Sequence, residues 1–123
     1  MSFDHGHPVE SLAVFPSLSL IVSSGGPVVK IWDVYQKKIL TTLSNHTKVV
    51  TSVCFSDSAS KLLTAGLDKR VNIFDTVGYE NIASVEFDSP ILSMALSPKD
   101  QTLAVGMAGG FLSVRQRKEN LLK

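Results

Sequence analysis

Short runs in which apolar and polar residues alternate occur along the whole chain, and turn residues separate them. Each run is rich in Val, Ile, Leu, Ser and Thr and is bounded by Gly, Pro, Asp, Ser or Asn. A period of two is typical of half-buried β-strands, and no run keeps the 3.6-residue period of a helix. The pattern therefore predicts an all-β protein with strands at residues 9–15, 20–24, 28–34, 39–44, 49–55, 61–66, 70–75, 81–87, 91–96, 102–107 and 111–116.

The chain also repeats itself with a period of about 42 residues. KIWD, which ends at Asp33, recurs as NIFD, which ends at Asp75, at a shift of 42 residues. VESLAVFP at 9–16, VTSVCFS at 50–56 and ILSMALSP at 91–98 align at shifts of 41 residues. Four antiparallel strands per repeat of this length are typical of one blade of a β-propeller. The predicted repeat units are residues 5–45, 46–88 and 89–118, followed by a tail at 119–123.

The ring predicted from these units is incomplete. The third unit has three strands and lacks the fourth, and SFD at 2–4 resembles EFD at 86–88, where the fourth strand of the second unit closes. We therefore expect about three four-stranded blades, cut from a larger ring, with two bare blade faces and two open sheet edges. Blades that bury both faces also explain why 44% of the residues are hydrophobic and only 19% are charged.

Composition narrows the function classes. Twelve basic and eleven acidic residues give a net charge of +1, which favours neither nucleic acid nor an anionic membrane as a general partner. Cys54 is the single cysteine, so an internal disulfide is excluded. The first ten residues, MSFDHGHPVE, lack the basic start and apolar run of a signal peptide, and no apolar run is long enough to cross a bilayer.

The order of these motifs resembles the WD-repeat family over nearly the whole chain. In that family a His before the first strand, a Ser or Thr in the second, an Asp in the next turn and a Trp in the third form a buried hydrogen-bonded set. Carried onto the second unit, these positions are His46, Thr64, Asp68 and Phe74. The resemblance implies that Asp68 accepts from the imidazole and that Thr64 bridges, while phenylalanine cannot donate the last bond.

The other two units depart from the family pattern. The first has His5 and Trp32, with Val22 at the Ser or Thr position and Gly26 at the Asp position. We expect Trp32, like its phenylalanine counterpart, to pack between stacked blades. The predicted structural motif comprises His5, Trp32, Asp33, His46, Thr64, Asp68, Phe74 and Asp75.

The third unit has neither His nor Trp at the motif positions, where Phe87 and Arg115 stand instead. The fold prediction does not depend on these side chains, because it rests on the strand order and the period.

Catalytic and metal chemistry find little support. The histidines at 5, 7 and 46 and Asp68 lack the spacing of a metal site, and the repeat already uses His46 and Asp68. Cys54 lies in an apolar strand, where a thiol stays protonated. The segments SSGGP and GMAGG lack the Lys-Ser or Lys-Thr of a phosphate loop. We expect no catalytic residue, cofactor or metal; the alternative from another class is a hydrolase that uses His46 and Asp68.

Basic residues mark the candidate contacts with a partner or with RNA. They are Lys69 and Arg70 in a predicted turn, and Arg115, Arg117 and Lys118 near the end of the chain. Solvated charge is the simpler reading, and contact with phosphate is the competing one. No aromatic platform accompanies these charges, so base-specific recognition is not predicted.

A narrower resemblance concerns function. HGHPVES and the third unit ending in SVRQRK resemble a WD-repeat subunit of the small-subunit processome. The resemblance implies a nucleolar, non-catalytic scaffold that works with other propeller and helical proteins in pre-ribosomal RNA transcription and processing toward the small-subunit RNA. Contact with the pre-ribosomal RNA would be indirect or non-specific, with no membrane and no small-molecule substrate. Such subunits have a complete propeller and a helical domain, so we expect a fragment. The alternative is a general WD-repeat adaptor, for example in ubiquitin ligation or signalling.

Overall fold

The structure is a computed structural model that describes residues 1–15 and 19–116. In this part of the chain the regular structure is β-strand, apart from one short 3-10 helix at Pro98–Asp100. No helix there is long and apolar enough to cross a membrane. The all-β prediction is confirmed. The strands are β1 Ser11–Val14, β2 Leu20–Gly25, β3 Val28–Asp33, β4 Lys38–Leu43, β5 Val50–Phe55, β6 Lys61–Gly66, β7 Arg70–Asp75, β8 Asn81–Glu86, β9 Ile91–Leu96, β10 Thr102–Met107 and β11 Leu112–Gln116.

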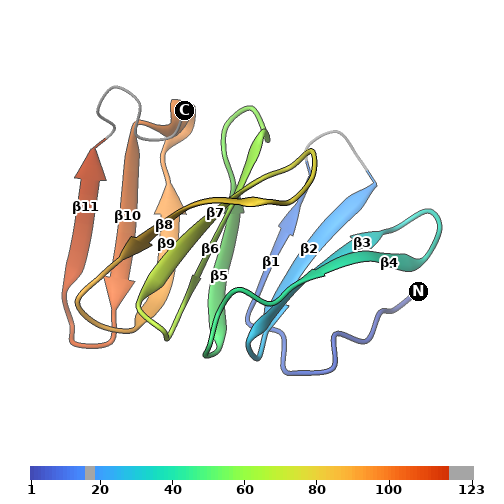
Figure 1. Ribbon diagram of the computed structural model, residues 1–123, viewed down its shortest axis with the longest axis horizontal. Coiled ribbons are helices and arrows are strands. Elements are labelled where there is room, and N and C mark those ends of the chain that lie inside the picture. The colour runs from blue at the N-terminus through green and yellow to red at the C-terminus, as the bar shows by residue number, and fades with distance from the viewer. Residues whose placement is uncertain (16–18, 117–123) are drawn as a thin grey trace.

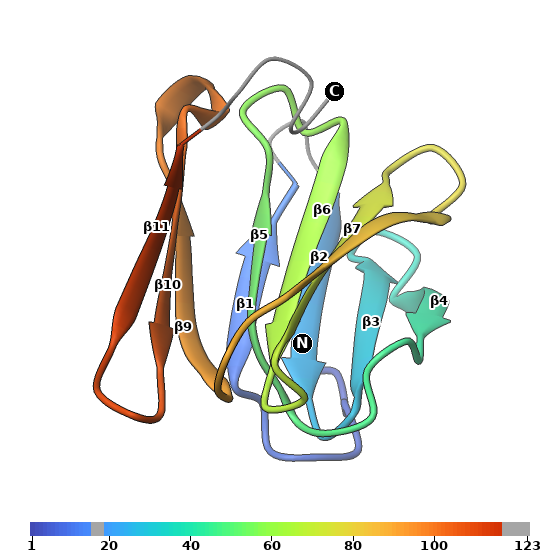
Figure 2. The ribbon, with the colours of Figure 1, turned by 60° about the vertical axis from the view of Figure 1, so that its left-hand side comes forward.

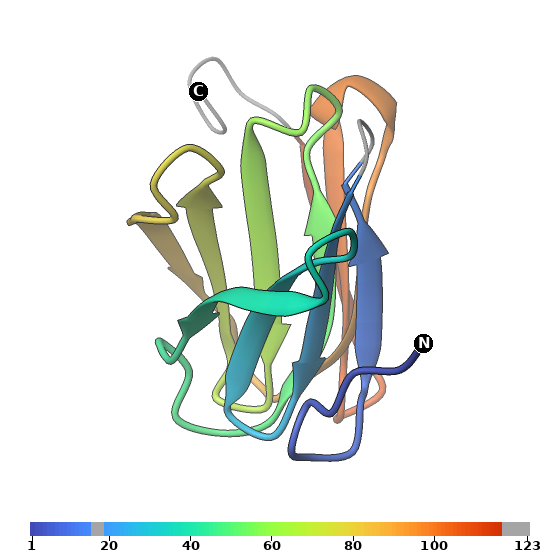
Figure 3. The same cartoon turned by 90° about the vertical axis from the view of Figure 1, so that its right-hand side faces the viewer.

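The strands form three antiparallel sheets in chain order. The first sheet is β1-β2-β3-β4, the second is β5-β6-β7-β8 and the third is β9-β10-β11. The sheets stand side by side (Figure 1), and the first strand of the middle sheet, β5, contacts both β1 and β9. Figure 2 shows the third sheet as a separate layer beside the other two, and in Figure 3 the first strands lie toward one side of the molecule and β8 toward the other. This is the predicted arc of stacked sheets, with three strands in the last one.

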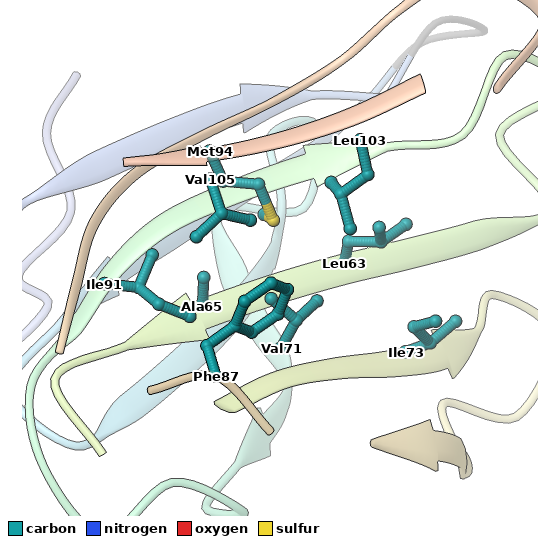
Figure 4. Close-up of a cluster of buried hydrophobic side chains, with 9 residues drawn as sticks. All are labelled: Leu63, Ala65, Val71, Ile73, Phe87, Ile91, Met94, Leu103 and Val105. Atoms are coloured by element: carbon teal, nitrogen blue, oxygen red, sulfur yellow. The ribbon is translucent and has the colours of Figure 1, made fainter. Parts of the chain in front are cut away.

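The second sheet is buried on both faces, because one apolar layer separates it from the first sheet and another separates it from the third. Leu62 and Leu63 are consecutive in β6, point to opposite faces, and are both 0% exposed. Leu62 and Phe74 pack against the first sheet, and Leu63 packs against the third. The residues between the second and third sheets, shown in Figure 4, are Leu63, Ala65, Val71, Ile73, Phe87, Ile91, Met94, Leu103 and Val105.

The same irregularity recurs in the first two sheets. The register between the third and fourth strands shifts between Ile31 and Trp32 in the first sheet and between Ile73 and Phe74 in the second. Such bulges increase the local twist of a sheet and re-aim side chains. In each sheet the bulge lies next to the aromatic residue of the predicted motif, Trp32 in the first and Phe74 in the second.

Candidate functional site

His46 lies at the centre of a buried hydrogen-bonded relay in the second sheet. Its Nδ1 is 3.0 Å from each carboxylate oxygen of Asp68, and its Nε2 is 2.7 Å from the hydroxyl of Thr64. A carboxylate can only accept, so Nδ1 carries the hydrogen and Nε2 accepts from Thr64. Asp68 also accepts from the backbone N–H groups of Thr47 and Arg70, at 3.1 and 3.3 Å. The loop before β5 is thereby tied to the turn after β6.

Asn72 and Ser84 extend this relay, and sequence reasoning missed both. The side-chain amide of Asn72 donates to Nε2 of His46 at 3.3 Å, and Ser84 donates to Oδ1 of Asn72 at 2.6 Å. Asn72 is 2% exposed and lies opposite Thr64 in the register of β6 and β7. A polar residue between Val71 and Ile73 in a strand buried on both faces was the available signal.

Phe74 has a packing role, whereas Trp32 at the same position of the first unit donates a hydrogen bond. It cannot donate a hydrogen bond, and it is 1% exposed in the apolar layer between the first and second sheets. Asn72, two residues earlier, provides the donor to His46 instead.

A second hydrogen-bonded relay lies in the first sheet. It shows which residue of this sheet occupies the Ser or Thr position of the motif. Trp32 Nε1 donates to the hydroxyl of Ser23 at 2.9 Å, and that hydroxyl is 2.7 Å from Nδ1 of His5. The assignment of Val22 to the Ser or Thr position was therefore wrong, because Ser23 stands there. Val22 points into the opposite layer and is 0% exposed.

A shorter turn is the physical reason for this error. Two residues, 26–27, separate β2 from β3, whereas three, 67–69, separate β6 from β7. Counting back 42 residues from Thr64 therefore reaches Val22 rather than Ser23. The shorter turn also leaves no aspartate, and the carbonyl of Gly25 accepts from Nε2 of His5 at 2.9 Å instead.

Gly25 has a steric as well as a polar part in this relay. A Cβ at this position would run into the backbone carbonyl of Pro8. The loop that carries His5 therefore needs a residue without a side chain here. In the second sheet, a Cβ at Gly66 would be 2.8 Å from the carbonyl of Val49, which indicates the same close approach.

The third sheet replaces the relay with a cation–π contact. The guanidinium carbon of Arg115 lies 4.7 Å from the centre of the Phe87 ring. These are the residues at the His and Trp positions, so the two side chains meet although neither has its usual chemistry. Phe87 also donates its backbone N–H to the carbonyl of Lys69 at 2.8 Å, which links this contact to the turn after β6.

The predicted basic contacts are partly brought together. Lys69 is exposed in the turn between β6 and β7, and Arg70 is exposed at the first position of β7. Arg115 is also exposed, and it stacks on Phe87, whose backbone N–H donates to the carbonyl of Lys69. Arg117 and Lys118 lie outside the described residues.

Acidic side chains surround these basic residues. Glu86 pairs with Arg70 in the strand register, and Glu86 and Asp88 line a hollow with Arg115. The local charge is mixed, which is weak support for a phosphate site.

Asp33 and Asp75 organise the turns that follow the third strands. Asp33 accepts from the backbone N–H of Gln36 at 2.9 Å. Asp75 accepts from the N–H groups of Gly78 at 2.8 Å and Val77 at 2.9 Å. These backbone donors, that of Gly78 first, lower the pKa of the Asp75 carboxyl from its ordinary value of 3.8.

The residues considered for catalysis or metal binding are poorly placed for either role. Burial raises the pKa of the Cys54 thiol from 9.0 to about 11, with a smaller contribution from the charge of Asp100. Among residues 1–15 and 19–116, no group of three His, Cys, Asp or Glu side chains could hold a metal ion. His46 and Asp68 are 2% and 4% exposed at their side chains, so neither is open to a substrate.

Comparison with known proteins gives the family. The family described as "WD domain, G-beta repeat" matches residues 1–33 and 37–75, more than half of the chain. The chain belongs to this WD-repeat family. The propeller fold is supported by the β-propeller domain of Myceliophteria thermophila Cps50 (Swd1), with a TM-score of 0.83 and 21% identity over 93% of this chain and 37% of that one. At this identity the likeness shows the fold alone, and the predicted incomplete WD-repeat propeller is confirmed.

Several relatives of this chain are named for U3 small nucleolar RNA. The "U3 small nucleolar RNA-associated protein 15 homolog" of Xenopus tropicalis is 47% identical over 96% of this chain. The human homolog is 44% identical over 100% of the chain, and the Schizosaccharomyces pombe protein is 38% identical over 96%. The chain spans about a quarter of the length of these relatives, 23%, 24% and 24% respectively.

Proposed function

We propose that this chain is a propeller segment of a non-catalytic scaffold that works with U3 small nucleolar RNA in the nucleolus. The scaffold acts in pre-ribosomal RNA transcription and processing toward the small-subunit RNA, together with other propeller and helical proteins of the processome. The observation that carries the proposal is 44% to 47% identity with vertebrate proteins named for U3 small nucleolar RNA, over 96% to 100% of the chain.

The geometry supports a scaffold rather than an enzyme. The histidines that could act as bases, His5 and His46, are 4% and 5% exposed and are occupied by neighbours within their own sheets. We propose that both relays serve folding, because they fix the loop before the first strand of each sheet to the turn after the second. Buried polar groups that lose such partners cost about 1–3 kcal/mol each.

Contact with the pre-ribosomal RNA is proposed to be indirect or non-specific. The basic group of Lys69, Arg70 and Arg115 lies among Asp68, Glu86 and Asp88, so its net charge is close to zero. A phosphate site needs an excess of basic side chains. This mixed surface is better suited to a protein partner with charges of both signs.

Co-purification tests the proposal. The tagged chain is expressed in fission yeast or human cells, and U3 small nucleolar RNA is measured in the purified material. The expected result is enrichment of this RNA over an unrelated small nuclear RNA, together with nucleolar proteins. Recovery of ubiquitin-ligase or signalling subunits without U3 RNA would favour the general adaptor instead.

Two paired variants separate direct from indirect RNA contact. Lys69→Ala with Arg70→Ala removes the basic charges where the turn after β6 leads into β7. Lys37→Ala with Lys38→Ala is a matched exposed control where the turn after β3 leads into β4. If contact is indirect, both variants recover U3 RNA as the unchanged chain does, and ultraviolet cross-linking to RNA stays at background. Selective loss of a cross-link in the first variant would contradict this part of the proposal.

A further inference from the structure

A hollow of about 360 Å³ lies between the segment that links the second sheet to the third and the turn after β10. It is lined by Asp88, Ser89, Met107, Gly109 and Phe111. Asp88 and Ser89 belong to the link between β8 and β9, and Gly109 and Phe111 belong to the turn between β10 and β11. We call this space the Gly109 hollow.

The turn between β10 and β11 has the geometry of the turn between β6 and β7. In the second sheet the N–H of Lys69 donates to the carbonyl of Gly66 at 3.2 Å, and in the third the N–H of Gly110 donates to the carbonyl of Met107 at 3.1 Å. Lys69 and Gly110 both have a positive φ, 71° and 88°. The two turns therefore correspond at a shift of 41 residues.

Gly109 thus stands at the position of Asp68. In the second sheet the carboxylate of Asp68 fills the space between the turn and the loop before β5, where it accepts from His46. Glycine leaves this space open in the third sheet. A Cβ at Gly109 would lie 3.9 Å from Oγ of Ser89 and 3.5 Å from the ring of Phe111. The hollow is therefore the room that an aspartate side chain occupies one sheet earlier.

The exposure of Phe111, which is 74%, belongs to its position in the turn. Its equivalent Arg70 is also exposed, although a sheet packs on each side of the second sheet. Phe111 lies two residues before Ser113, which pairs with the buried Val105, so its side of the strand faces the second sheet. Both walls of the hollow therefore belong to the described chain, and an aromatic ring stands at its edge.

Ser89 gives the hollow a polar group without a partner. Its Oγ is buried and has no hydrogen-bond partner among residues 1–15 and 19–116. Buried hydroxyls are normally paired, because an unpaired one costs free energy. A donor that enters the hollow would satisfy this oxygen after a rotation of the serine side chain.

The charge around the hollow favours a cation. Of its five lining residues, Asp88 alone is charged. In the adjoining hollow, Glu86 adds a second carboxylate, and the guanidinium of Arg115 there is already stacked on Phe87. A carboxylate of a partner would meet like charges in this space, whereas a cation would gain from Asp88.

We propose that the Gly109 hollow binds an arginine side chain of a protein partner. The alkyl part of the arginine packs on Met107, and its guanidinium lies over the ring of Phe111. The guanidinium pairs with Asp88 at the rim and donates to Ser89. Arginine fits better than lysine, because a planar guanidinium can stack on a ring while it donates from its edges. This inference names the chemistry of a partner and rests on the proposed scaffold role.

Titration of the isotope-labelled chain with short peptides, followed by NMR, tests the proposal. The probes are acetyl-Gly-Arg-Gly-amide and the same peptide with citrulline, lysine or glutamate in place of arginine. The arginine peptide is expected to shift the amide signals of Ser89, Gly109 and Phe111 until they saturate. Citrulline has nearly the same shape without the charge, so its peptide should bind about tenfold more weakly. The lysine peptide should also bind more weakly, and the glutamate peptide should not bind.

Three variants locate the binding. Gly109→Leu fills the hollow, where a Cβ makes only ordinary contacts, and should abolish the shifts. Asp88→Asn and Phe111→Ala each remove one contact and should weaken binding by about three- to tenfold. The matched controls are Asp57→Asn, at an exposed carboxylate, and Tyr35→Ala, at an aromatic residue that is 80% exposed in the turn after β3. Both should bind the arginine peptide as the unchanged chain does.

Circular dichroism checks that each variant keeps its strands. If leucine at position 109 unfolds the third sheet, the two variants at exposed residues, Asp88→Asn and Phe111→Ala, decide the outcome. Binding of the citrulline or lysine peptide as tight as that of the arginine peptide, binding of the glutamate peptide, or shifts confined to other residues would each overturn the proposal. Unchanged binding by a folded Gly109→Leu variant would do the same.

Failure of this inference and failure of the proposed function give different results. If the unchanged chain recovers U3 RNA from cells but binds no arginine peptide, the hollow is rejected and the scaffold is kept. If the chain binds the arginine peptide but recovers no U3 RNA, the arginine site is kept and the assignment to the U3 complex is rejected.

Discussion

The side-chain amide of Asn72 donates to Nε2 of His46 at 3.3 Å, and in this way it supplies a donor that Phe74 cannot. In the first sheet the corresponding donor is the indole of Trp32, which binds the hydroxyl between it and His5. The two sheets thus complete the hydrogen bonds around a buried imidazole differently: Asn72 donates to the ring of His46 itself, and Trp32 donates to the Ser23 hydroxyl beside the ring of His5. The relay can be kept while the residues that compose it change, as long as each buried polar atom has a partner.

Replacement of His46 by alanine is expected to lower the free energy of unfolding by about 1–3 kcal/mol, because Thr64 and Asn72 lose a buried partner. Urea unfolding followed by circular dichroism measures the change. His7→Ala, at an exposed histidine, is the matched control and should have a smaller effect. Unchanged stability together with loss of a hydrolytic activity would contradict the structural role and favour the hydrolase alternative.

The two aromatic residues of the repeated motif should differ in their contribution to stability. Phe74→Ala opens a cavity in the layer between the first two sheets, where Phe74 is 1% exposed, and should cost about 3–5 kcal/mol. Trp32→Ala acts on a half-buried ring that packs against Phe3 and should cost less. Both are measured by urea unfolding at a concentration where the chain is monomeric. Equal losses would show that Trp32 is as deeply packed as Phe74 in solution.

Much of the fold could be predicted because the sheets repeat. Alternation set the strands, and the turn residues between them placed most strand ends within one residue, for example Arg70–Asp75 as predicted. The first strand was the largest miss: it was predicted at 9–15 and spans Ser11–Val14. The residues on either side of this strand still hydrogen-bond to β2, Glu10 to the carbonyl of Ser24 and Phe15 to that of Leu20, so the alternation continues past the regular strand ladder.

The relays were harder to predict than the strands. Val22 and Ser23 are both acceptable in a strand, and only the length of the next turn decides which one meets His5. Asn72 has no local signature either, since its partner His46 is 26 residues away in sequence. Side-chain contacts across a sheet depend on register, and one residue of slip reverses the face.

The turn after β7 should make the chain sensitive to acid. Backbone donors, Gly78 first and then Val77, lower the pKa of the Asp75 carboxyl below 3.8. The folded value is lower than the unfolded one, so this contribution to stability is present above the unfolded pKa and is lost as the pH falls through the folded pKa. Asp75→Asn should therefore reduce stability near neutral pH and weaken its decline in acid. Urea unfolding between about pH 7 and about pH 3 measures both effects.

A control for this prediction is Asp57→Asn, which removes an exposed carboxylate from the turn between β5 and β6. NMR titration of the Asp75 side-chain carboxyl gives its pKa directly in the folded protein. A value at or above 3.8 would contradict the assignment of the backbone N–H groups as its donors.

The thiol of Cys54 is expected to be slow toward disulfide reagents in the folded protein. Burial raises its pKa from 9.0 to about 11, and the charge of Asp100 adds to the shift. A shift of this size lowers the thiolate fraction near pH 8 by about a hundredfold, and the thiolate is the reactive form. Reaction with Ellman's reagent should therefore be slow in buffer and fast in urea, where the thiol is exposed.

The same shift predicts how alkaline pH acts on stability. Because the folded pKa of Cys54 is higher than the unfolded one, its contribution is fully present below about pH 9 and is lost as the pH rises toward 11. Cys54→Ser lacks this ionisation, so its unfolding free energy should decline less over that range. A native reaction rate as fast as the rate in urea would contradict the buried thiol and would place the β5 strand, and with it the contact between the second and third sheets, in the solvent.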